Sequence, residues 1–396
     1  MQAICEESSV CVTVPNGSPV KIGVLQALSG KSVSLGTEQV RGIELAVDSY
    51  QGKIAGHDIE MQKEDTSCSF EGGANAALKI VSNPDIVGII GTTCSIAAAS
   101  ASKIMSDAGM VMISGNNSAP FLTSMNGKRA PDFHEGFLRT ANNEENAGKA
   151  AATFAFNNLG KKRAATVNDG DIYTRGLSEG FESAFRALGG TIVLSATVNK
   201  GDDEMGPLME AVKYSAPDIL FFPLFQPEGN KILKKAREIP ELADLTLMSD
   251  GALIESTFID DINELGTGMY FVGPARPETD GSLELEKKYR EKFNMEPMTS
   301  YYLTAFDAAT LLFNAIETVA VRENNGTLYI DRKKLRENLY STRNFKGVTG
   351  TLNCNSFGDC ALPRFNILRL DDPKAGIAGL TSNIIYTYFG KTDSGE

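Results

Sequence analysis

The sequence lacks an apolar run of about 18 residues, the length that a membrane-spanning helix needs. The sequence also lacks an excess of basic residues. Its 38 lysines and arginines and 50 aspartates and glutamates give a net charge of −12. The two basic clusters, at 161–163 and 234–235, are short. Binding to nucleic acid requires a basic surface that neutralises many phosphates. We therefore expect no nucleic-acid partner and no membrane insertion of this chain.

Signatures of catalysis are scarce as well. There are only two histidines, His57 and His134, and neither belongs to a pattern that predicts a Ser-His-Asp triad. Gly23 and Gly30 have the wrong spacing for a phosphate-binding or dinucleotide-binding loop. The acidic stretch 168–171 could bind a metal ion, but its place between a predicted strand and helix favours helix capping. We expect no enzymatic activity, no cofactor and no resident metal.

The ends of the chain and its six cysteines bear on location. The N-terminus has neither the basic nor the apolar region of a signal peptide, so we expect either a cytosolic protein or one whose signal segment is absent from this chain. The cysteines can pair as Cys5–Cys11, Cys68–Cys94 and Cys354–Cys360, with a zinc site as the alternative. Such disulfides would indicate an oxidising location outside the cytoplasm. Around 353–360 we favour a cysteine-closed hairpin over a calcium loop.

Short apolar segments alternate with amphipathic helical patterns through the first two thirds of the chain. The segments are too short and too uniformly apolar for exposed strands, which indicates buried parallel strands in open sheets with helices on both faces. After residue 269 one strand leads into a long helix, and strands alternate again after residue 349. The predicted parallel strands are 20–25, 86–90, 110–113, 164–167, 219–222 and 245–248.

The strand and helix pattern runs twice, and two lobes are more economical than one very large sheet. We expect an α/β fold of two doubly wound parallel-sheet lobes joined by several connecting strands. Residues 1–139 and 274–350 would form the N-terminal lobe, and residues 140–273 and 351–396 the C-terminal lobe. A length of 396 residues agrees with two or three domains.

Small polar residues follow two of the predicted strands. Gly-Thr-Thr-Cys-Ser at 91–95 follows the strand 86–90, and Ser-Gly-Asn-Asn-Ser at 114–118 follows the next one. In open α/β sheets, ligands bind outside the carboxyl ends of the strands, where helix N-termini present free N–H groups to anions. Ser95 could contact such an anion or simply cap its helix. The two adjacent polar segments predict a binding cleft.

Several motifs in this order together resemble those of one family. They are Leu-Ser-Gly at 28–30, Gly-Ile-Glu-Leu-Ala-Val-Asp at 42–48, Glu-Asp-Thr-Ser-Cys at 64–68 and Gly-Thr-Thr-Cys-Ser at 91–95. The segments 112–123, 231–237 and 357–359 also match. The sequence is therefore similar to the type I periplasmic amino-acid-binding proteins, which include the branched-chain amino-acid receptors of ABC importers. The resemblance covers nearly the whole chain.

The resemblance implies that two lobes close on a ligand held between them, and that Cys68 bridges Cys94. It puts the contacts of a ligand α-carboxylate at Ser95 and Ser118, with the backbone near Asn117, and the partner of the α-ammonium at Asp250. Hydroxyl and N–H donors would then bind the anion, and a carboxylate the cation. The remaining residues implied to line the ligand pocket are Tyr173, Phe225, Tyr301, Leu35 and Thr93.

Departures from the family pattern bear on ligand specificity. Asp250 replaces a longer Glu, Leu35 an aromatic residue, Thr93 an apolar residue and Asn117 a small one. A polar ligand could hydrogen-bond Asn117, so a branched-chain ligand is not assured. For Phe225 and Tyr173, ordinary core packing is the alternative to a pocket wall.

The resemblance implies a monomeric solute receptor that delivers a small amino acid to the membrane permease of an ABC importer. The receptor would be periplasmic or lipid-anchored at the cell surface. Three alternatives remain: the same fold with a non-amino-acid carboxylate or a urea-like amide as ligand, an extracellular sensor domain of a signalling receptor, and a hydrolase.

Overall fold

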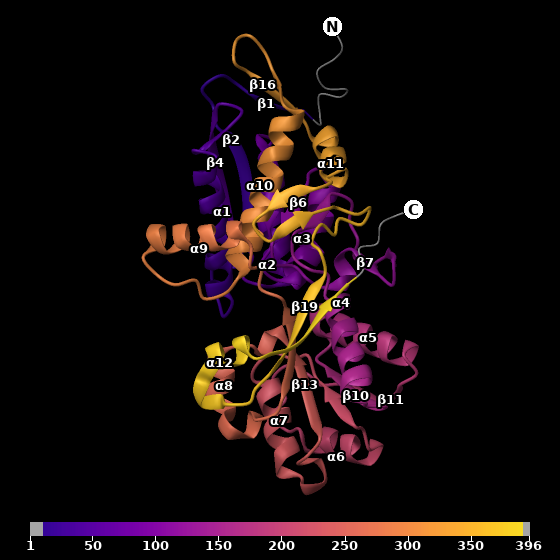
Figure 1. Cartoon of the computed structure of the whole chain (residues 1–396). Helices are drawn as coiled ribbons and strands as arrows, with labels where there is room; N and C mark the ends of the chain where they lie inside the picture. Colours follow the sequence, from indigo (N-terminus) through magenta and orange to yellow (C-terminus); the bar gives the residue numbers. More distant parts are fainter. Residues whose placement is uncertain (1–10, 391–396) are drawn as a thin grey trace. The chain divides into compact units, whose positions relative to one another are not determined.

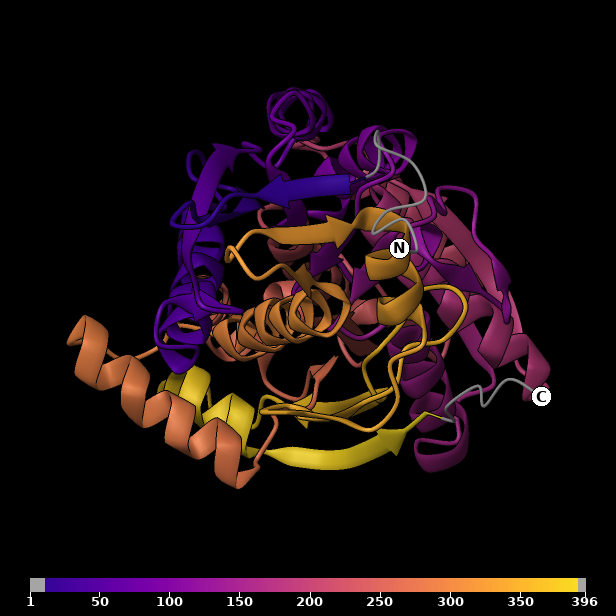
Figure 2. The same cartoon turned by 90° about the horizontal axis from the view of Figure 1, so that it is seen from above.

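A computed structural model describes residues 11–390, which form two compact α/β units. Within this range the chain contributes 11–142 and 276–362 to unit 1, and 143–275 and 363–390 to unit 2. In unit 1, elements from 276–362, orange in Figure 1, lie among elements from the beginning of the described chain, which are indigo. Figure 2 shows the same neighbourhood of indigo and orange elements from above.

The sheet of unit 1 has the order β3-β4-β2-β5-β6-β9 and is parallel except for the short β3. Its central strands are fully or almost fully apolar, because helices cover both faces. Residues of β2 and β5 pack with Ile43 of α1 and Leu312 of α10 in one buried cluster. The strands are β2 (Val20–Gln26), β3 (Lys53–Ile54), β4 (His57–Asp65), β5 (Ile86–Gly91), β6 (Met112–Ser114) and β9 (Phe137–Arg139).

Close helix packing in unit 1 depends on Gly42. A Cβ atom at Gly42 would lie 2.2 Å from the carbonyl oxygen of Tyr302, so only glycine allows α1 to approach α10 this closely. The helices of unit 1 are α1 (Val33–Ser49), α2 (Phe70–Val81), α3 (Ser95–Asp107), α9 (Asp280–Phe293), α10 (Tyr301–Val319) and α11 (Arg332–Tyr340).

Short antiparallel pairs complete unit 1. One sheet has the order β1-β16-β15, so the beginning of the described chain pairs with a strand from 276–362. Asp307 of α10 fixes the turn of the hairpin β17–β18. Its carboxylate accepts hydrogen bonds from the N–H groups of Val348 and Thr349 at 2.7 and 2.9 Å. The strands are β1 (Cys11–Val14), β7 (Ser124–Met125), β8 (Lys128–Arg129), β15 (Val321–Arg322), β16 (Leu328–Asp331), β17 (Phe345–Gly347) and β18 (Gly350–Leu352).

Unit 2 has a seven-stranded sheet of order β11-β10-β12-β13-β14-β19-β20. The first five strands in this order are parallel, whereas β19 and β20 are antiparallel additions at one edge. The strands are β10 (Arg163–Asn168), β11 (Thr191–Thr197), β12 (Ile219–Phe221), β13 (Thr246–Asp250), β14 (Tyr270–Pro274), β19 (Arg364–Arg369) and β20 (Ile384–Phe389).

Helices cover both faces of the sheet in unit 2. Ile219 and Phe221 of β12 pack on one side with residues of α4 and α5, and Leu220 packs on the other side with residues of α6, α7 and α8. This alternation follows from the two-residue period of a strand. The helices are α4 (Glu145–Thr153), α5 (Ile172–Ala187), α6 (Gly206–Ser215), α7 (Glu228–Glu238), α8 (Ser256–Ile262) and α12 (Gly376–Ser382).

The structure agrees with the predicted fold class and adds two features. The six predicted parallel strands are present as β2, β5, β6, β10, β12 and β13. The sheet of unit 2 is mixed rather than purely parallel, and helix α9 was not predicted. Within residues 11–390 the chain passes from unit 1 to unit 2 after Leu362, not near 350, because Cys360 N–H donates to the carbonyl of Arg139 and keeps the preceding hairpin in unit 1.

Candidate functional site

The carboxyl edge of the unit 1 sheet carries the first group of predicted contacts. Strand β5 ends at Gly91 and α3 begins at Ser95, with Cys94 as its N-cap. The Cys94 side chain makes no capping hydrogen bond, so no side chain caps the first-turn N–H groups of α3 from that position. Free N–H groups at a helix N-terminus favour an anion. The N-cap position of α3 is occupied by Cys94, and Ser95 is the first residue of the helix. The capping role considered for Ser95 is therefore wrong.

Ser95 lies next to the polar segment that follows β6. Its Oγ accepts a hydrogen bond from the N–H of Ala119 at 3.2 Å, which leaves the hydroxyl proton to be donated. Ser114 Oγ accepts from the N–H of Asn117 at 2.8 Å and fixes the start of the same turn. The fold therefore brings Ser95 and the segment around Ser118 to one edge of one sheet. Their roles as ligand contacts stay predictions.

A buried guanidinium holds the backbone on both sides of Ser118. Arg139 Nη1 donates to the carbonyl oxygens of Asn117 at 3.1 Å and Ala119 at 2.8 Å. Arg139 Nε donates to Asp359 at 2.6 Å, so the buried charge is paired. A buried ion pair with further hydrogen bonds is rigid, because breaking it would leave an uncompensated charge. Arg139 thus acts as a positioning residue for Ser118.

The disulfide Cys68–Cys94 joins the segment after β4 to the N-cap of α3. The same segment is fixed by Asp65, whose carboxylate accepts hydrogen bonds from the N–H groups of Leu28 and Ser67, both at 2.8 Å. Burial alone would raise the pKa of Asp65, but these hydrogen bonds, with those from the hydroxyls of Ser29 and Ser67, lower it to about 2. The edge of the sheet is therefore locked by both covalent and charge-assisted bonds.

Three further predicted residues belong to unit 1. Thr93 is buried, and its Oγ1 accepts from the N–H of Ala27 at 2.9 Å and donates to Gln26 Oε1 at 2.7 Å. Leu35 in the first turn of α1 and Tyr301, the first residue of α10, are half-buried. Gln26 was missed by the sequence argument, because a single polar residue at the end of an apolar strand carries no motif.

Asp250, the last residue of β13, is the central acidic group of unit 2. Its side chain is fully buried, and Tyr173 Oη donates a hydrogen bond to its carboxylate. Burial raises the pKa of Asp250 to about 6, although hydrogen bonds from Tyr173 and from the N–H of Ala252 oppose that rise. Within residues 11–390 no lysine or arginine forms an ion pair with Asp250. A buried carboxylate of this kind suits a cationic ligand.

A second carboxylate, which sequence reasoning missed, lies beside the same phenol. Glu144, the N-cap residue of α4, is buried, and its Oε2 is 3.5 Å from Tyr173 Oη. Tyr173 Oη therefore lies within hydrogen-bonding distance of two carboxyl groups, those of Glu144 and Asp250. No signal in the sequence pairs Glu144 with Asp250, because only the folded sheet brings α4 close to the end of β13.

Tyr173 and Phe225 form an aromatic pair with ring centroids 5.6 Å apart. Phe225 is 41% exposed, which excludes the core-packing alternative for this residue. Lys200 lies next to the pair: its Nζ is 5.8 Å from the Phe225 ring centroid and 2.7 Å from Asp171 Oδ2. Burial lowers the pKa of Lys200, but the carboxylates of Asp171 and Asp169 raise it overall.

The structure decides two local alternatives. Asp171 is the N-cap of α5 and accepts a hydrogen bond from the N–H of Tyr173 at 2.9 Å, which confirms capping by the stretch 168–171. No group of three or more potential metal ligands occurs in the part of the chain that the structure describes. The disulfide Cys354–Cys360 closes a hairpin, as predicted, whereas Cys5 of the predicted pair Cys5–Cys11 lies outside the described residues.

One sequence pattern needed a structural test. Gly176-Leu-Ser-Glu-Gly180 has the G-x-S-x-G form of a hydrolase nucleophile elbow, a pattern that the argument against catalysis held to be absent from this sequence. An elbow requires a sharp turn between a strand and a helix. All five residues instead lie inside α5, and Ser178 is buried. The pattern therefore makes no nucleophile elbow here.

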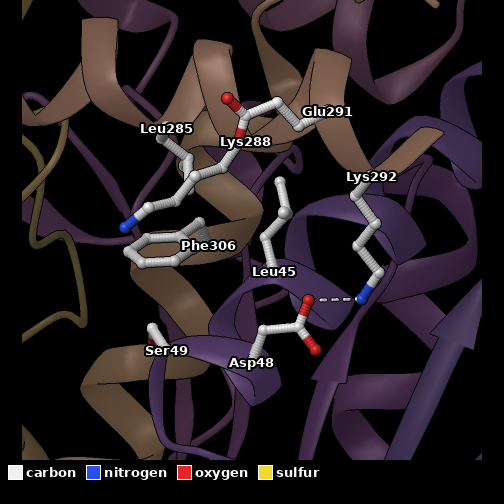
Figure 3. A pocket seen from close by; sticks show the side chains of 8 residues that line it. All are labelled: Leu45, Asp48, Ser49, Leu285, Lys288, Glu291, Lys292 and Phe306. Atoms are coloured by element: carbon white, nitrogen blue, oxygen red, sulfur yellow. Dashed lines mark hydrogen bonds and ion pairs between the residues drawn. The ribbon is translucent and has the colours of Figure 1, made fainter. Parts of the chain in front are cut away.

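Unit 1 has a separate cavity of about 510 Å³ between α1, α9 and α10. Figure 3 shows Leu45, Leu285 and Phe306 in its wall and the ion pair between Lys292 and Asp48 at one side. None of the predicted ligand contacts lines this cavity. Of the helices within residues 11–390, none combines the length and the apolar character that crossing a bilayer requires.

Comparison with known proteins gives an independent result. A family model described as periplasmic binding protein matches residues 19–356. The Leu/Ile/Val-binding protein BraC3 of Rhizobium johnstonii is 25% identical over 344 residues, which cover 85% of this chain and 90% of that protein. An amino acid binding protein of Pseudomonas aeruginosa is 24% identical and covers 74% of this chain and 78% of its own length.

Solved structures share the fold. A leucine binding protein from Thermotoga maritima superposes with a TM-score of 0.75 at 22% identity and covers 94% of this chain and 98% of its own. Another similar structure is a solute binding protein of an ABC transporter from Rhodopseudomonas palustris in complex with p-hydroxybenzoic acid. It has a TM-score of 0.76 at 18% identity, and the match covers 95% of this chain and 98% of that protein. At these identities the likeness shows the fold alone.

Proposed function

The chain belongs to the periplasmic binding protein family, and on that premise we propose that it is an extracytoplasmic receptor that captures a small amino acid for an ABC importer. The observation that carries the proposal is the state of Asp250. This carboxylate is buried without a cationic partner in the described chain, and its pKa is raised to about 6. A ligand ammonium would supply the missing positive charge.

The chemistry of unit 1 supports the other half of the proposal. The hydroxyl of Ser95 and the first turn of α3 offer donors to an anion, and Arg139 fixes the backbone around Ser118. An amino acid carries an anion and a cation on the same α-carbon. We propose that one zwitterion contacts both sets of residues, so that binding favours the state in which both contacts form.

Tyr173 and Phe225 would contact the rest of the ligand from unit 2. Their ring pair offers apolar area, and the Glu144 carboxyl group lies beside the same phenol. Because the chain is a binding protein by family, we expect binding without turnover of the ligand.

A thermal-shift screen of the common amino acids tests the proposal. A ligand that binds only the folded state raises the melting temperature through linkage. We expect one or a few amino acids to do so, and we expect Asp250→Asn to abolish the shift. A shift that survives in Asp250→Asn would refute the assignment of the ammonium site.

Asp307→Asn is a matched control for that substitution. Asp307 is likewise buried, and its pKa is likewise raised to about 6 by burial, but it belongs to α10 and holds the β17–β18 hairpin. We expect this variant to be less stable than the unaltered chain and to keep its ligand affinity.

An aromatic carboxylate is the alternative ligand. The p-hydroxybenzoic acid complex of the Rhodopseudomonas palustris protein suggests it, and the exposed ring of Phe225 could stack on such a ligand. A ligand without an amine would leave Asp250 buried and unpaired. Benzoate and 4-hydroxybenzoate therefore belong in the same screen, and a shift with these compounds alone would favour the alternative.

Two finer assignments complete the proposal. The disulfides Cys68–Cys94 and Cys354–Cys360 support an oxidising compartment, so we place the receptor in the periplasm or on a lipid anchor at the cell surface. Its partner would be the membrane permease of the importer, to which it would bind as a monomer. Size-exclusion chromatography with light scattering measures the oligomeric state.

A further inference from the structure

Two buried side-chain amides stand at the carboxyl edge of the unit 1 sheet with donors that have no partner. Gln26 ends β2, and Asn117 follows β6. Both residues are fully buried. Within the described chain, Gln26 Nε2 and Asn117 Nδ2 have no hydrogen-bond acceptor. Buried amide donors are almost always paired in folded proteins, so each unpaired one requires an explanation.

The orientation of the Asn117 amide follows from its neighbours. Its Oδ1 accepts hydrogen bonds from the backbone N–H of Thr92 at 3.0 Å and from Thr92 Oγ1 at 3.1 Å. A backbone N–H can only donate, so the atom that faces it must be the amide oxygen. Nδ2 is therefore the atom left unpaired, and turning the amide over would break the bond to Thr92.

The Gln26 amide is paired with the hydroxyl of Thr93. Thr93 Oγ1 accepts a hydrogen bond from the N–H of Ala27 at 2.9 Å and donates its own proton to Gln26 Oε1 at 2.7 Å. In this arrangement the Thr93 proton has an acceptor, whereas Gln26 Nε2 has none. Nε2 is therefore the unpaired atom of Gln26.

Both amides are attached to the segment that leads into the ligand-binding helix. Thr92 and Thr93 are neighbours between β5 and α3, and Ser95 begins that helix. The two unpaired donors thus belong to the same sheet edge as the proposed carboxylate contacts. We propose that the side chain of the bound amino acid ends in a neutral oxygen acceptor, a hydroxyl or a carboxamide, that pairs with these donors. This inference rests on the proposed function.

A neutral acceptor fits better than a charged one. The guanidinium next to Asn117 belongs to Arg139, which already binds Asp359 and the carbonyls of Asn117 and Ala119. A ligand side-chain carboxylate would be buried here without a cation of its own, which is costly. A hydrocarbon side chain would leave both amide donors unpaired. A site built to donate hydrogen bonds rejects an analogue that lacks the acceptor.

Isothermal titration calorimetry with pairs of similar shape tests the inference on the unaltered chain. Threonine is compared with valine, and asparagine with leucine. We expect the member with the oxygen acceptor to bind more tightly by about tenfold or more, where tenfold corresponds to about 1.4 kcal/mol. Equal or tighter binding of valine and leucine, or tightest binding of aspartate or glutamate, would overturn the inference and leave the proposed function standing.

Two variants localise the preference, and a third serves as control. Gln26→Met and Asn117→Leu each remove one donor at nearly constant volume, so we expect each to reduce the preference for the polar member of a pair. Gln62→Met alters a glutamine on the neighbouring strand β4 and should leave the preference unchanged. Asn117→Leu also removes the acceptor for Thr92, so Gln26→Met is the decisive variant if that protein does not fold. If no amino acid binds, the proposed function fails and this inference fails with it.

Discussion

At the scale of single residues, Asp250 connects stability with binding. Its pKa is raised from 3.8 to about 6, so the folded protein disfavours the ionised form that a ligand ammonium needs. This difference corresponds to about 3 kcal/mol of destabilisation above pH 6, because both the folded and the unfolded chain are then ionised. The destabilisation shrinks as the pH falls from about 6 to 3.8. We infer that ligand binding recovers part of this energy.

A pH dependence of affinity follows. Binding of the ammonium requires ionised Asp250, so affinity should be constant above about pH 7 and fall by up to about tenfold per pH unit below pH 6. Isothermal titration calorimetry between pH 5 and 8 measures the profile, with an amino acid whose own groups do not titrate in that range. An affinity at pH 5 equal to that at pH 7.5 would show that Asp250 does not bind the charge.

Arg139 carries a second prediction at this scale. Arg139→Met would remove the buried cation that pairs with the largely buried Asp359 and would release the carbonyls on both sides of Ser118. We expect a loss of about 3–5 kcal/mol of stability, as for other buried pairs that lose one partner. Urea unfolding measures this loss, and ligand affinity should fall as well. The double variant Arg139→Met with Asp359→Asn should be more stable than Arg139→Met alone. A smaller free energy of unfolding for the double variant would contradict this account.

The candidate site was predictable where it follows strand ends. Ser95 and Ser118 belong to the short polar segments that follow two buried strands, so alternation and turn signals indicate them, whereas Asp250 ends a third strand and was implied by the family resemblance. Glu144 and Gln26 could not be found in this way. Their side chains reach the site only through tertiary packing, and neither belongs to a local pattern.

At the scale of elements, the two described disulfides should differ in their effect. Loop-closure entropy predicts that removal of Cys68–Cys94, with a sequence separation of 26, costs about 3–4 kcal/mol, and removal of Cys354–Cys360, with a separation of 6, about 2 kcal/mol. Double serine variants and urea unfolding measure both. Only removal of Cys68–Cys94 should also weaken ligand binding strongly, because Cys94 directly precedes Ser95. A greater loss of affinity in the second variant would contradict this expectation.

Helix α9 explains why the sequence argument missed an element. Of its residues, Ser282, Leu285 and Tyr289 are buried, and much of the rest of the helix is charged. So narrow an apolar stripe gives a weak helical period. The antiparallel strands β19 and β20 were anticipated as alternating strands but not as additions to the second sheet, because strand pairing across distant segments leaves no local signal.

At the scale of the whole molecule, alternation of strands and helices gave the two-sheet α/β class, since parallel sheets covered on both faces need almost continuous apolar strands. The third passage between the units could not be placed from the sequence. It depends on the pairing of the segment around Asp359 with Arg139, a contact between residues far apart in the chain.

Ligand binding should stabilise the whole protein. A ligand present at about 100 times its dissociation constant adds about 2.7 kcal/mol to the free energy of unfolding if it binds only the folded state. Urea unfolding with and without the best amino acid from the screen measures this gain. The gain should vanish in Asp250→Asn, and the same gain in that variant would mean that the ligand binds elsewhere.

The central claim is that a zwitterion is recognised through both of its charges. Isothermal titration calorimetry with three matched ligands tests it most directly: the best amino acid, the same molecule without its amine, and the same molecule without its carboxylate. We predict measurable binding of the amino acid alone, with each analogue weaker by about a hundredfold or more, since a buried partner would lose its counter-charge. Binding of the amine-free acid as tightly as the amino acid would contradict the account.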